Sequence, residues 1–227
     1  LRTEVDVLTM SATPIPRTLH MSLSGIRDIS IINTAPQERL PIRTFVTEQA
    51  DSLTREVILR ELDRGGQVYF VHNRVHSIDR IAAHLREVVP EARVGIGHGQ
   101  MAEDVLEDVI VSFVRHDFDI LLCTTIIESG IDIPNVNTIV IDDADRFGLT
   151  QLYQLRGRVG RGNHRAYAYL LHKPHKALSE VAQARLDAIQ DATELGAGMQ
   201  VALRDMEIRG AGNVLGAEQS GNIAEVG

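Results

Sequence analysis

Cysteine, lysine and tryptophan are scarce or missing in this chain of 227 residues. It contains one cysteine, Cys123, and no tryptophan, and aromatic residues make up 4% of it. A single cysteine excludes an internal disulfide and any zinc site built from several cysteines of this chain. We therefore expect a reducing, cytoplasmic compartment, no bound structural metal, and a stability that comes from the core.

Long hydrophobic runs are also missing. No stretch approaches the roughly 20 uninterrupted apolar residues that a membrane helix needs, and Leu1 to Asp6 resemble neither a secretion signal nor a transit peptide. The composition, 44% hydrophobic and 24% charged, is ordinary for a globular protein. We expect no membrane partner.

The only two lysines are Lys173 and Lys176. Neither follows the glycine-rich run of a phosphate-binding loop, G-x-x-x-x-G-K-[ST]. The sequence therefore predicts that the chain has no P-loop of its own.

Charge is unevenly distributed along the chain. The net charge of −8 argues against binding nucleic acid through bulk charge, yet the stretch from Arg146 to Ser179 has no acidic residue. Such a gap can be a chance feature of a solvated face, or it can serve phosphate binding, which we favour. Its seven basic residues are Arg146, Arg156, Arg158, Arg161, Arg165, Lys173 and Lys176.

Short apolar runs alternate with segments of helical period, which is typical of parallel strands joined by crossover helices. The apolar repeats at 78–88 and 105–113 predict two of these helices, the first with Ser77 as N-cap and Pro90 at its end. The predicted fold is α/β, a parallel sheet with helices on both faces. The predicted strands are Val5–Met10, Arg43–Thr47, Val68–Val71, Val94–Ile96, Ile120–Thr124, Thr138–Ile141 and Ala166–Leu171.

The two ends of the chain differ from this pattern. After Pro174, helical segments at about 177–194 and 199–208 predict a helical hairpin, and the glycine-containing stretch 209–227 predicts a loop. At the other end, strand 5–10 has no partner before it, and Pro36 and Pro41 bracket a possible linker. We therefore divide the chain into the end of a preceding domain (1–33), a main domain (34–172) and the hairpin with its loop (173–227).

Polar residues follow several predicted strands, at the edge where ligands bind in open parallel sheets. Each cluster has a plain alternative: His98 as a turn residue, Asp142 and Asp143 as strand-end caps, and Cys123 as a buried small hydrophobe. The run from Gly95 to Gly99 lacks the spacing of a dinucleotide fingerprint. The clusters are His72-Asn73-Arg74, Gly97-His98-Gly99-Gln100, Thr124-Thr125 with Glu128 to Asp132, and Asp142-Asp143-Ala144-Asp145.

The most specific pattern is Gln154-x-x-Gly157-Arg158-x-Gly160-Arg161. On a helix, Arg158 and Arg161 would lie one turn apart on the same face, where two guanidinium groups can reach one polyphosphate. The two glycines would weaken such a helix, which indicates close approach of the backbone. The alternative is a structural ion-pair role, which needs carboxylates from outside the stretch 146–179.

Taken together, Ser11-Ala12-Thr13, the strand-end clusters and the arginine pattern resemble motifs III to VI of the superfamily 2 helicases and translocases. Longer matches, among them SATPIPRTLHMSLSGIRDISII, GIGHGQM, CTTIIESGIDIP and MEIRGAGNVLGAEQSG, resemble the family of bacterial transcription-repair coupling factors, with the RecG helicases next. The resemblance covers nearly the whole chain. It implies a RecA-like second motor lobe followed by a helical hairpin and translocation loop.

The resemblance also implies roles for single residues toward ATP and Mg²⁺, which the missing first RecA-like lobe would mainly bind. Arg158 and Arg161 would be arginine fingers on the γ-phosphate, supported by Gln154. Gly130 and Asp132 would face the nucleotide cleft.

Other positions in the resemblance concern DNA and coupling. Ser11 and Thr13 would bridge the lobes, and Arg209 and Gln219 would transmit lobe closure to the DNA; Arg209 could instead cap a helix end. The expected partners are double-stranded DNA, the first lobe and, through absent domains, RNA polymerase and nucleotide-excision-repair proteins. A RecG-like fork remodeller and a non-enzymatic interaction module remain alternatives. The expected DNA-tracking residues are Asn73, Arg74, His98, Gly99, Thr124 and Thr125.

Overall fold

The computed structural model describes most of the chain from residue 40 onward, with short gaps. The described residues are Leu8, Met10, Ser11, Thr13, Ser30, Ile32, 40–125, 133–162, 164–193 and 196–220, the side chains of 211–220 excepted. The predicted strand Val5–Met10 and the boundary near residue 33 thus lie largely outside the described residues and stay predictions.

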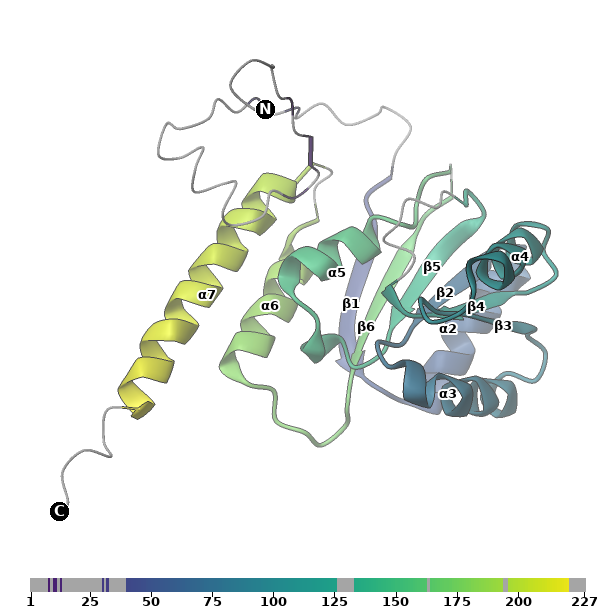
Figure 1. Cartoon of the computed structure of the whole chain (residues 1–227), viewed down its shortest axis with the longest axis horizontal. Helices are drawn as coiled ribbons and strands as arrows, with labels where there is room; N and C mark the ends of the chain where they lie inside the picture. Colours follow the sequence, from purple (N-terminus) through teal and green to yellow (C-terminus); the bar gives the residue numbers. More distant parts are fainter. Residues whose placement is uncertain are drawn as a thin grey trace.

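Six parallel strands form one sheet, as the apolar runs predict (Figure 1). The order across the sheet is β1-β6-β5-β2-β4-β3, and every neighbouring pair is parallel. All strand carboxyl ends therefore lie at one edge of the sheet, called the carboxyl edge below, and all amino ends at the other. The strands are β1 (Arg43–Glu48), β2 (Gln67–Val71), β3 (Val94–Gly97), β4 (Ile120–Cys123), β5 (Val136–Ile141) and β6 (Tyr167–His172).

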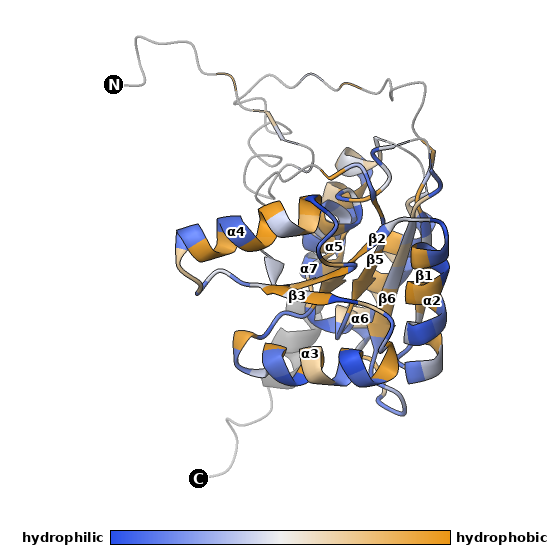
Figure 2. Ribbon diagram, turned by 90° about the vertical axis from the view of Figure 1, so that its right-hand side faces the viewer, coloured by the Kyte–Doolittle hydropathy of each residue, from blue (hydrophilic) through white to orange (hydrophobic). Residues whose placement is uncertain are grey.

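Helices cover both faces of this sheet. One core contains Ile58 of α2 and Leu85 of α3 packed on Val68 of β2. The other contains residues of α4, α5, α6 and α7 together with the opposite sides of the same strands, and Figure 2 shows apolar strand residues between α3 and α4. The helices are α2 (Asp51–Asp63), α3 (Val75–Val88), α4 (Glu103–Val114), the short 3-10 helix η2 (Ala144–Arg146), α5 (Leu149–Arg156), α6 (Glu180–Asp191) and α7 (Gly198–Ser220).

The central strands are buried on both faces because they lie between these two cores. Every residue of β2, β4 and β5 is buried, which explains why these strands are mostly apolar and do not show a regular alternation of apolar and polar residues. Cys123 at the end of β4 is fully buried, and burial raises the pKa of its thiol. This confirms its prediction as a small core residue.

Two helix starts differ from the predictions. The helix α3 begins at Val75, with Arg74 as its N-cap, so the prediction of Ser77 as the cap is wrong. The hydroxyl of Ser77 instead contacts His72. The helix α6 begins at Glu180, after the predicted start, because the Ser179 hydroxyl accepts a hydrogen bond from the Ala182 amide and caps it there.

The helix α4 is less buried than its apolar repeat predicts. Among its residues only Phe113 is fully buried, and Val105 is 46% exposed. The repeat therefore marks the correct helix, but most of its apolar side chains lie only partly against the sheet.

The predicted loop after residue 208 is wrong over most of its length. The helix α7 continues through this stretch to Ser220 and packs along α5 and α6 (Figure 1). A glycine costs only about 1 kcal/mol in a helix interior, and the intervening alanine, leucine, glutamate and glutamine are good helix formers. Glycines here weaken the helix without ending it.

Among the described helices, none is both long enough and apolar enough to cross a membrane.

Candidate functional site

The residues predicted to contact DNA and those predicted to contact ATP lie in two separate places. Those that follow β2, β3 and β4, together with Asp142 and Asp143 after β5, share the carboxyl edge. Gln154 lies in α5, whereas Arg158 and Arg161 lie in the loop between α5 and β6. This loop, residues 157–166, is called the arginine loop below.

At the carboxyl edge, His72 joins three elements through buried hydrogen bonds. Its Nδ1 lies 2.7 Å from Asp142 Oδ2, after β5, and its Nε2 lies 2.7 Å from Ser77 Oγ in the first turn of α3. Its backbone amide donates to the Cys123 carbonyl at the end of β4, at 2.8 Å. His72 and Asp142 are only 5% and 4% exposed. The edge is therefore held by a connected polar network.

Asp142 and Asp143 have different partners. Asp142 contacts His72, whereas Asp143 Oδ2 lies 3.5 Å from Arg74 Nη2 and 3.3 Å from Arg146 Nε. Asp143 has a φ of 49°, in the left-handed region that aspartate tolerates better than most residues. The prediction of simple strand-end caps is thus incomplete, because both carboxylates bind side chains of the edge.

The remaining predicted DNA-tracking residues lie along the same edge. Asn73 and Gly99 are exposed, and Arg74, His98 and Thr125 are half-buried. Thr124 is 8% exposed, and its amide donates to the Gly97 carbonyl.

The glycine run before His98 has a packing explanation. A Cβ added to Gly95 would lie 2.6 Å from the ring of Phe118, so the strand needs a glycine there to pack against that ring. The glycine at position 95 therefore has a packing role, in agreement with the prediction that the run from Gly95 to Gly99 is not a dinucleotide-binding motif.

The arginine loop is not helical, so the prediction that Arg158 and Arg161 share one helix face is wrong. The helix α5 ends at Arg156, and Gly160 has a φ of +74°. A Cβ at Gly160 would lie 2.9 Å from the Ala166 Cβ and 3.3 Å from Ile42 Cγ1. Left-handed backbone and close packing both require glycine at this position.

The arginine loop lies toward the amino edge of the sheet. Its last residue, Ala166, accepts a hydrogen bond from the amide of Arg43, where β1 begins, and Gly162 packs beside the carbonyl of Pro134, just before β5. Arg158 and Arg161 are half-buried, and both contact other residues of the chain. The arginine pair and the carboxyl edge are therefore distinct sites.

Three further residues of the basic stretch have internal partners. The Arg156 guanidinium donates to the Ile189 carbonyl at 2.8 Å, lies over the Tyr153 ring, and has its pKa lowered by burial. Lys176 pairs with Asp145 and Arg146 with Asp143. Arg146 and Lys176 therefore form ion pairs with carboxylates from just outside the stretch, whereas Arg156 has a structural role without a carboxylate partner.

Thr13 contacts the motif that contains the arginines. Gln154 Nε2 donates to Thr13 Oγ1 at 2.9 Å, and Thr13 is only 1% exposed. The Ser11 hydroxyl donates to the Thr13 carbonyl at 2.7 Å and accepts from the Thr13 amide at 3.2 Å. The sequence placed these residues in separate motifs, and the structure brings them together.

The predicted coupling residues at the other end are only partly described. Arg209 donates to Asp205, four residues earlier in α7, so it does not cap a helix end. Asp205 is 1% exposed and also accepts from Thr150 in α5. Gln219 lies in α7, but its side chain is outside the described residues, as are Gly130 and Asp132 altogether.

The donor set can be tested against ATP and Mg²⁺. Arg158 and Arg161, on a glycine-containing loop, are suited to an anionic γ-phosphate. Within the described ranges, no three histidine, cysteine or carboxylate side chains cluster as a metal site would require. The two arginines thus fit contact with the nucleotide phosphates.

Comparison with known proteins gives concordant matches. The family model described as the helicase conserved C-terminal domain matches residues 48–163. Transcription-repair-coupling factors from Myxococcus xanthus, Bacillus subtilis and Mycobacterium tuberculosis are 58%, 56% and 60% identical over essentially the whole chain. The chain spans only 18 to 19% of the length of these relatives.

Solved structures agree with the fold. The structure of RecG bound to a three-way DNA junction matches 92% of this chain and 28% of that chain, with a TM-score of 0.73 and 35% identity. Saccharomyces cerevisiae Dbp5 bound to RNA and ADP BeF3 matches 80% of this chain and 47% of that chain, with a TM-score of 0.56 and 16% identity, which concerns the fold alone. The predicted RecA-like helicase lobe is confirmed.

Proposed function

Because the chain belongs to the helicase conserved C-terminal domain family, we propose that it is the second motor lobe of an ATP-dependent double-stranded DNA translocase. The first lobe, with the P-loop that this sequence lacks, would belong to the same longer protein. The motor would move along duplex DNA and displace stalled RNA polymerase in transcription-coupled repair. The whole-length identity to transcription-repair-coupling factors supports this assignment.

The observation that carries the proposal is the arginine loop. Arg158 and Arg161 lie on a loop fixed by Gly160 rather than on a helix buried in the core. Guanidinium groups in this setting stabilise the charge that develops on a transferred γ-phosphate held by another lobe. ATP and Mg²⁺ would be bound mainly by the first lobe, with Gly130 and Asp132 also facing the nucleotide.

The carboxyl edge would contact the DNA backbone. Its hydroxyl, amide, imidazole and guanidinium groups suit phosphate oxygens, and such contacts position a protein on DNA without selecting a sequence. The scarcity of aromatic residues argues against base stacking as the main grip. The proposed contacts come from Asn73, Arg74, His98, Gly99, Thr124 and Thr125.

Coupling between the two sites would use residues at both ends of the chain. The bond between Thr13 and Gln154 supports a role for Ser11 and Thr13 in linking the lobes. Arg209 and Gln219 on α7 would pass lobe movement to the DNA. RNA polymerase and nucleotide-excision-repair proteins would bind through other parts of the longer protein.

A RecG-like fork remodeller is the second candidate. The match to RecG, with a TM-score of 0.73 over 92% of this chain, favours it. The identity of 35% to RecG is lower than the 56% to 60% to transcription-repair-coupling factors. Two assays of the longer protein distinguish these candidates. A translocase of transcription-coupled repair should displace stalled RNA polymerase, whereas a fork remodeller should reverse a DNA fork.

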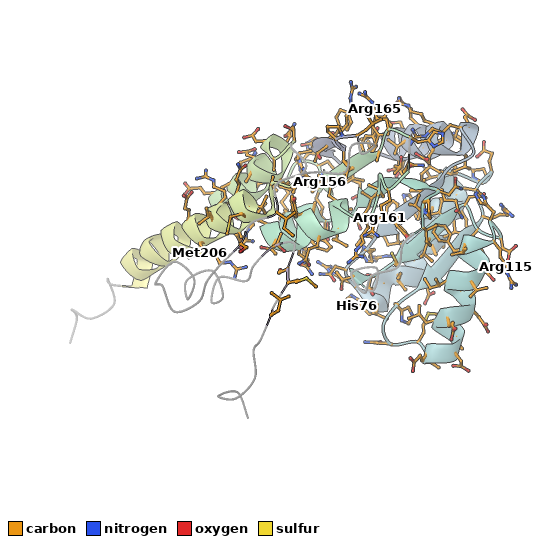
Figure 3. All side chains as sticks on the ribbon, turned by 90° about the horizontal axis from the view of Figure 1, so that it is seen from above. His76, Arg115, Arg156, Arg161, Arg165 and Met206 are labelled. Carbon is orange, nitrogen blue, oxygen red and sulfur yellow. The ribbon has the colours of Figure 1, made fainter. Side chains whose placement is uncertain are left out.

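The test is ATP hydrolysis by the longer, two-lobed protein. We expect Arg158→Ala and Arg161→Ala each to lower its ATPase rate by about 10³-fold to 10⁵-fold, the range for arginine fingers. The 227-residue chain alone should not hydrolyse ATP. Arg165→Ala is the matched control, because Arg165 is an exposed arginine of the same loop, which Figure 3 shows apart from Arg161. Full turnover in both finger variants would refute the assignment.

A further inference from the structure

The His72 network contains three buried groups to which the proposed motor gives no role. Asp142, His72 and Ser77 are connected in that order through the two imidazole nitrogens, with both distances at 2.7 Å. They come from the end of β5, the end of β2 and the first turn of α3. None of the three is more than 8% exposed.

The order carboxylate, imidazole, hydroxyl also occurs in serine hydrolases, where it activates the hydroxyl as a nucleophile. That chemistry requires the hydroxyl to reach a substrate. Here Ser77 is buried inside the first turn of α3. The network therefore does not suit nucleophilic catalysis, and its role must lie in what it holds in place.

The network encloses the short segment of Asn73 and Arg74. His72 precedes Asn73 and Arg74 directly, and Ser77 lies just beyond them. The Ser77 amide and hydroxyl both donate to the Arg74 carbonyl, at 3.3 Å and 3.4 Å. His72 is in turn fixed to β4 by its amide and to β5 by Asp142. His72, before the segment, is thus bonded to the sheet, and Ser77, after it, is bonded to His72. Asn73 between them is exposed.

We propose that His72, Asp142 and Ser77 form a positioning device that sets the backbone and direction of Asn73 and Arg74 for contact with DNA phosphates. The inference rests on the proposed function, because it concerns the same DNA-tracking edge. His72 and Ser77 act only through their neighbours and do not touch DNA. Fixing these two residues in advance removes an ordering cost that DNA binding would otherwise carry.

The test uses DNA-stimulated ATP hydrolysis by the two-lobed protein, with the duplex DNA concentration varied. Ser77→Ala removes only the hydroxyl, and His72→Ala removes both links. We expect the half-saturating DNA concentration to rise about threefold to fivefold for Ser77→Ala and about tenfold for His72→Ala, in line with one and two lost hydrogen bonds. The maximal rate at saturating DNA should stay within about twofold, because the arginine loop lies at the other edge of the sheet.

Two further variants separate positioning from general stability. Ser77→Thr keeps the hydroxyl and should restore the half-saturating concentration to that of the unaltered protein. His84→Ala is the control, since His84 pairs with Asp51 at 2.8 Å in an exposed contact on α3. It should change neither parameter. A network that only stabilises the fold would lower the maximal rate, through loss of folded protein, and leave the half-saturating concentration unchanged.

The outcomes are distinguishable. An unchanged half-saturating DNA concentration in both His72→Ala and Ser77→Ala would overturn the positioning role. If Asn73→Ala and Arg74→Ala weaken DNA stimulation in the same experiment, the proposed function survives that result. Absence of any DNA stimulation in the unaltered two-lobed protein would instead overturn the proposed function itself.

Discussion

The carboxyl edge and the arginine loop differ in how their polar side chains are held. At the carboxyl edge, buried side chains of one strand end bond to those of the next, as His72 does with Asp142. In the arginine loop, the backbone is fixed by glycine conformation and packing at Gly160. One region is ordered by side-chain hydrogen bonds and the other by main-chain geometry.

This difference suits the two proposed ligands, which are the DNA backbone and the γ-phosphate of ATP. A DNA backbone moves past the motor, and a preformed row of donors suits repeated contacts with equivalent phosphates. An arginine finger must reach one phosphoryl group at one step of the cycle, and its position depends on the backbone that carries it. We therefore expect substitutions of different kinds to disable the two regions.

The largest effect should come from the backbone of the arginine loop. Gly160→Ala forces an alanine into left-handed backbone and places its Cβ 2.9 Å from that of Ala166. We expect a loss of about 2 kcal/mol in the free energy of unfolding, measured by urea denaturation of the 227-residue chain.

Gly157→Ala is the matched control, because Gly157 lies in the same loop but in ordinary right-handed backbone. Gly157 has a φ of −67°, and its nearest atoms lie at 3.4 Å from an added Cβ. Its effect should stay within about 0.5 kcal/mol. Equal effects of the two substitutions would show that backbone geometry does not fix this loop.

An intermediate effect should come from the contact between Thr13 and Gln154. Thr13→Val keeps the shape of the side chain but removes the acceptor of the bond from Gln154. Together with Gln154→Ala it forms a double-mutant cycle, for which we expect a coupling of about 1 kcal/mol in urea denaturation. Simple additivity would mean that the bond contributes nothing to the attachment of Thr13.

The smallest effect should come from Asp143, whose carboxylate pairs with Arg74 and Arg146. Asp143→Asn removes a negative charge that competes with DNA phosphates, while asparagine tolerates the left-handed backbone. The half-saturating duplex concentration in the ATPase assay should fall roughly twofold, because the two arginine partners already neutralise most of the Asp143 charge. Asp119→Asn, at the start of β4, makes the same charge change away from the edge and should have no such effect. Weaker DNA binding in Asp143→Asn would show that the carboxylate supports Arg74 and does not compete for it.

How far the sequence predicts this molecule depends on the range of the interactions involved. A buried strand such as β4 is recognisable because burial on both faces demands apolar residues in an unbroken run. The strand-end clusters follow directly, since parallel strands bring their ends together. These features need only local composition and the rule of parallel connection.

Other features depend on partners that are remote in the sequence. Ser77 has the right residue type for an N-cap, but its hydroxyl is used by His72, which itself depends on Asp142 seventy residues away. The bond between Thr13 and Gln154 spans 141 positions. The helical spacing of Arg158 and Arg161 was misleading because left-handed backbone at Gly160 cannot be recognised from the glycine alone.

The connection from β4 to β5 links the two proposed sites along the chain. It leaves β4 at Thr124, among the proposed DNA contacts, and enters β5 after Pro134, whose carbonyl packs beside Gly162 of the arginine loop. Because β4 and β5 run in the same direction, the chain between them must return from the carboxyl edge to the amino edge of the sheet. The two proposed sites are therefore joined directly along the chain as well as through the sheet.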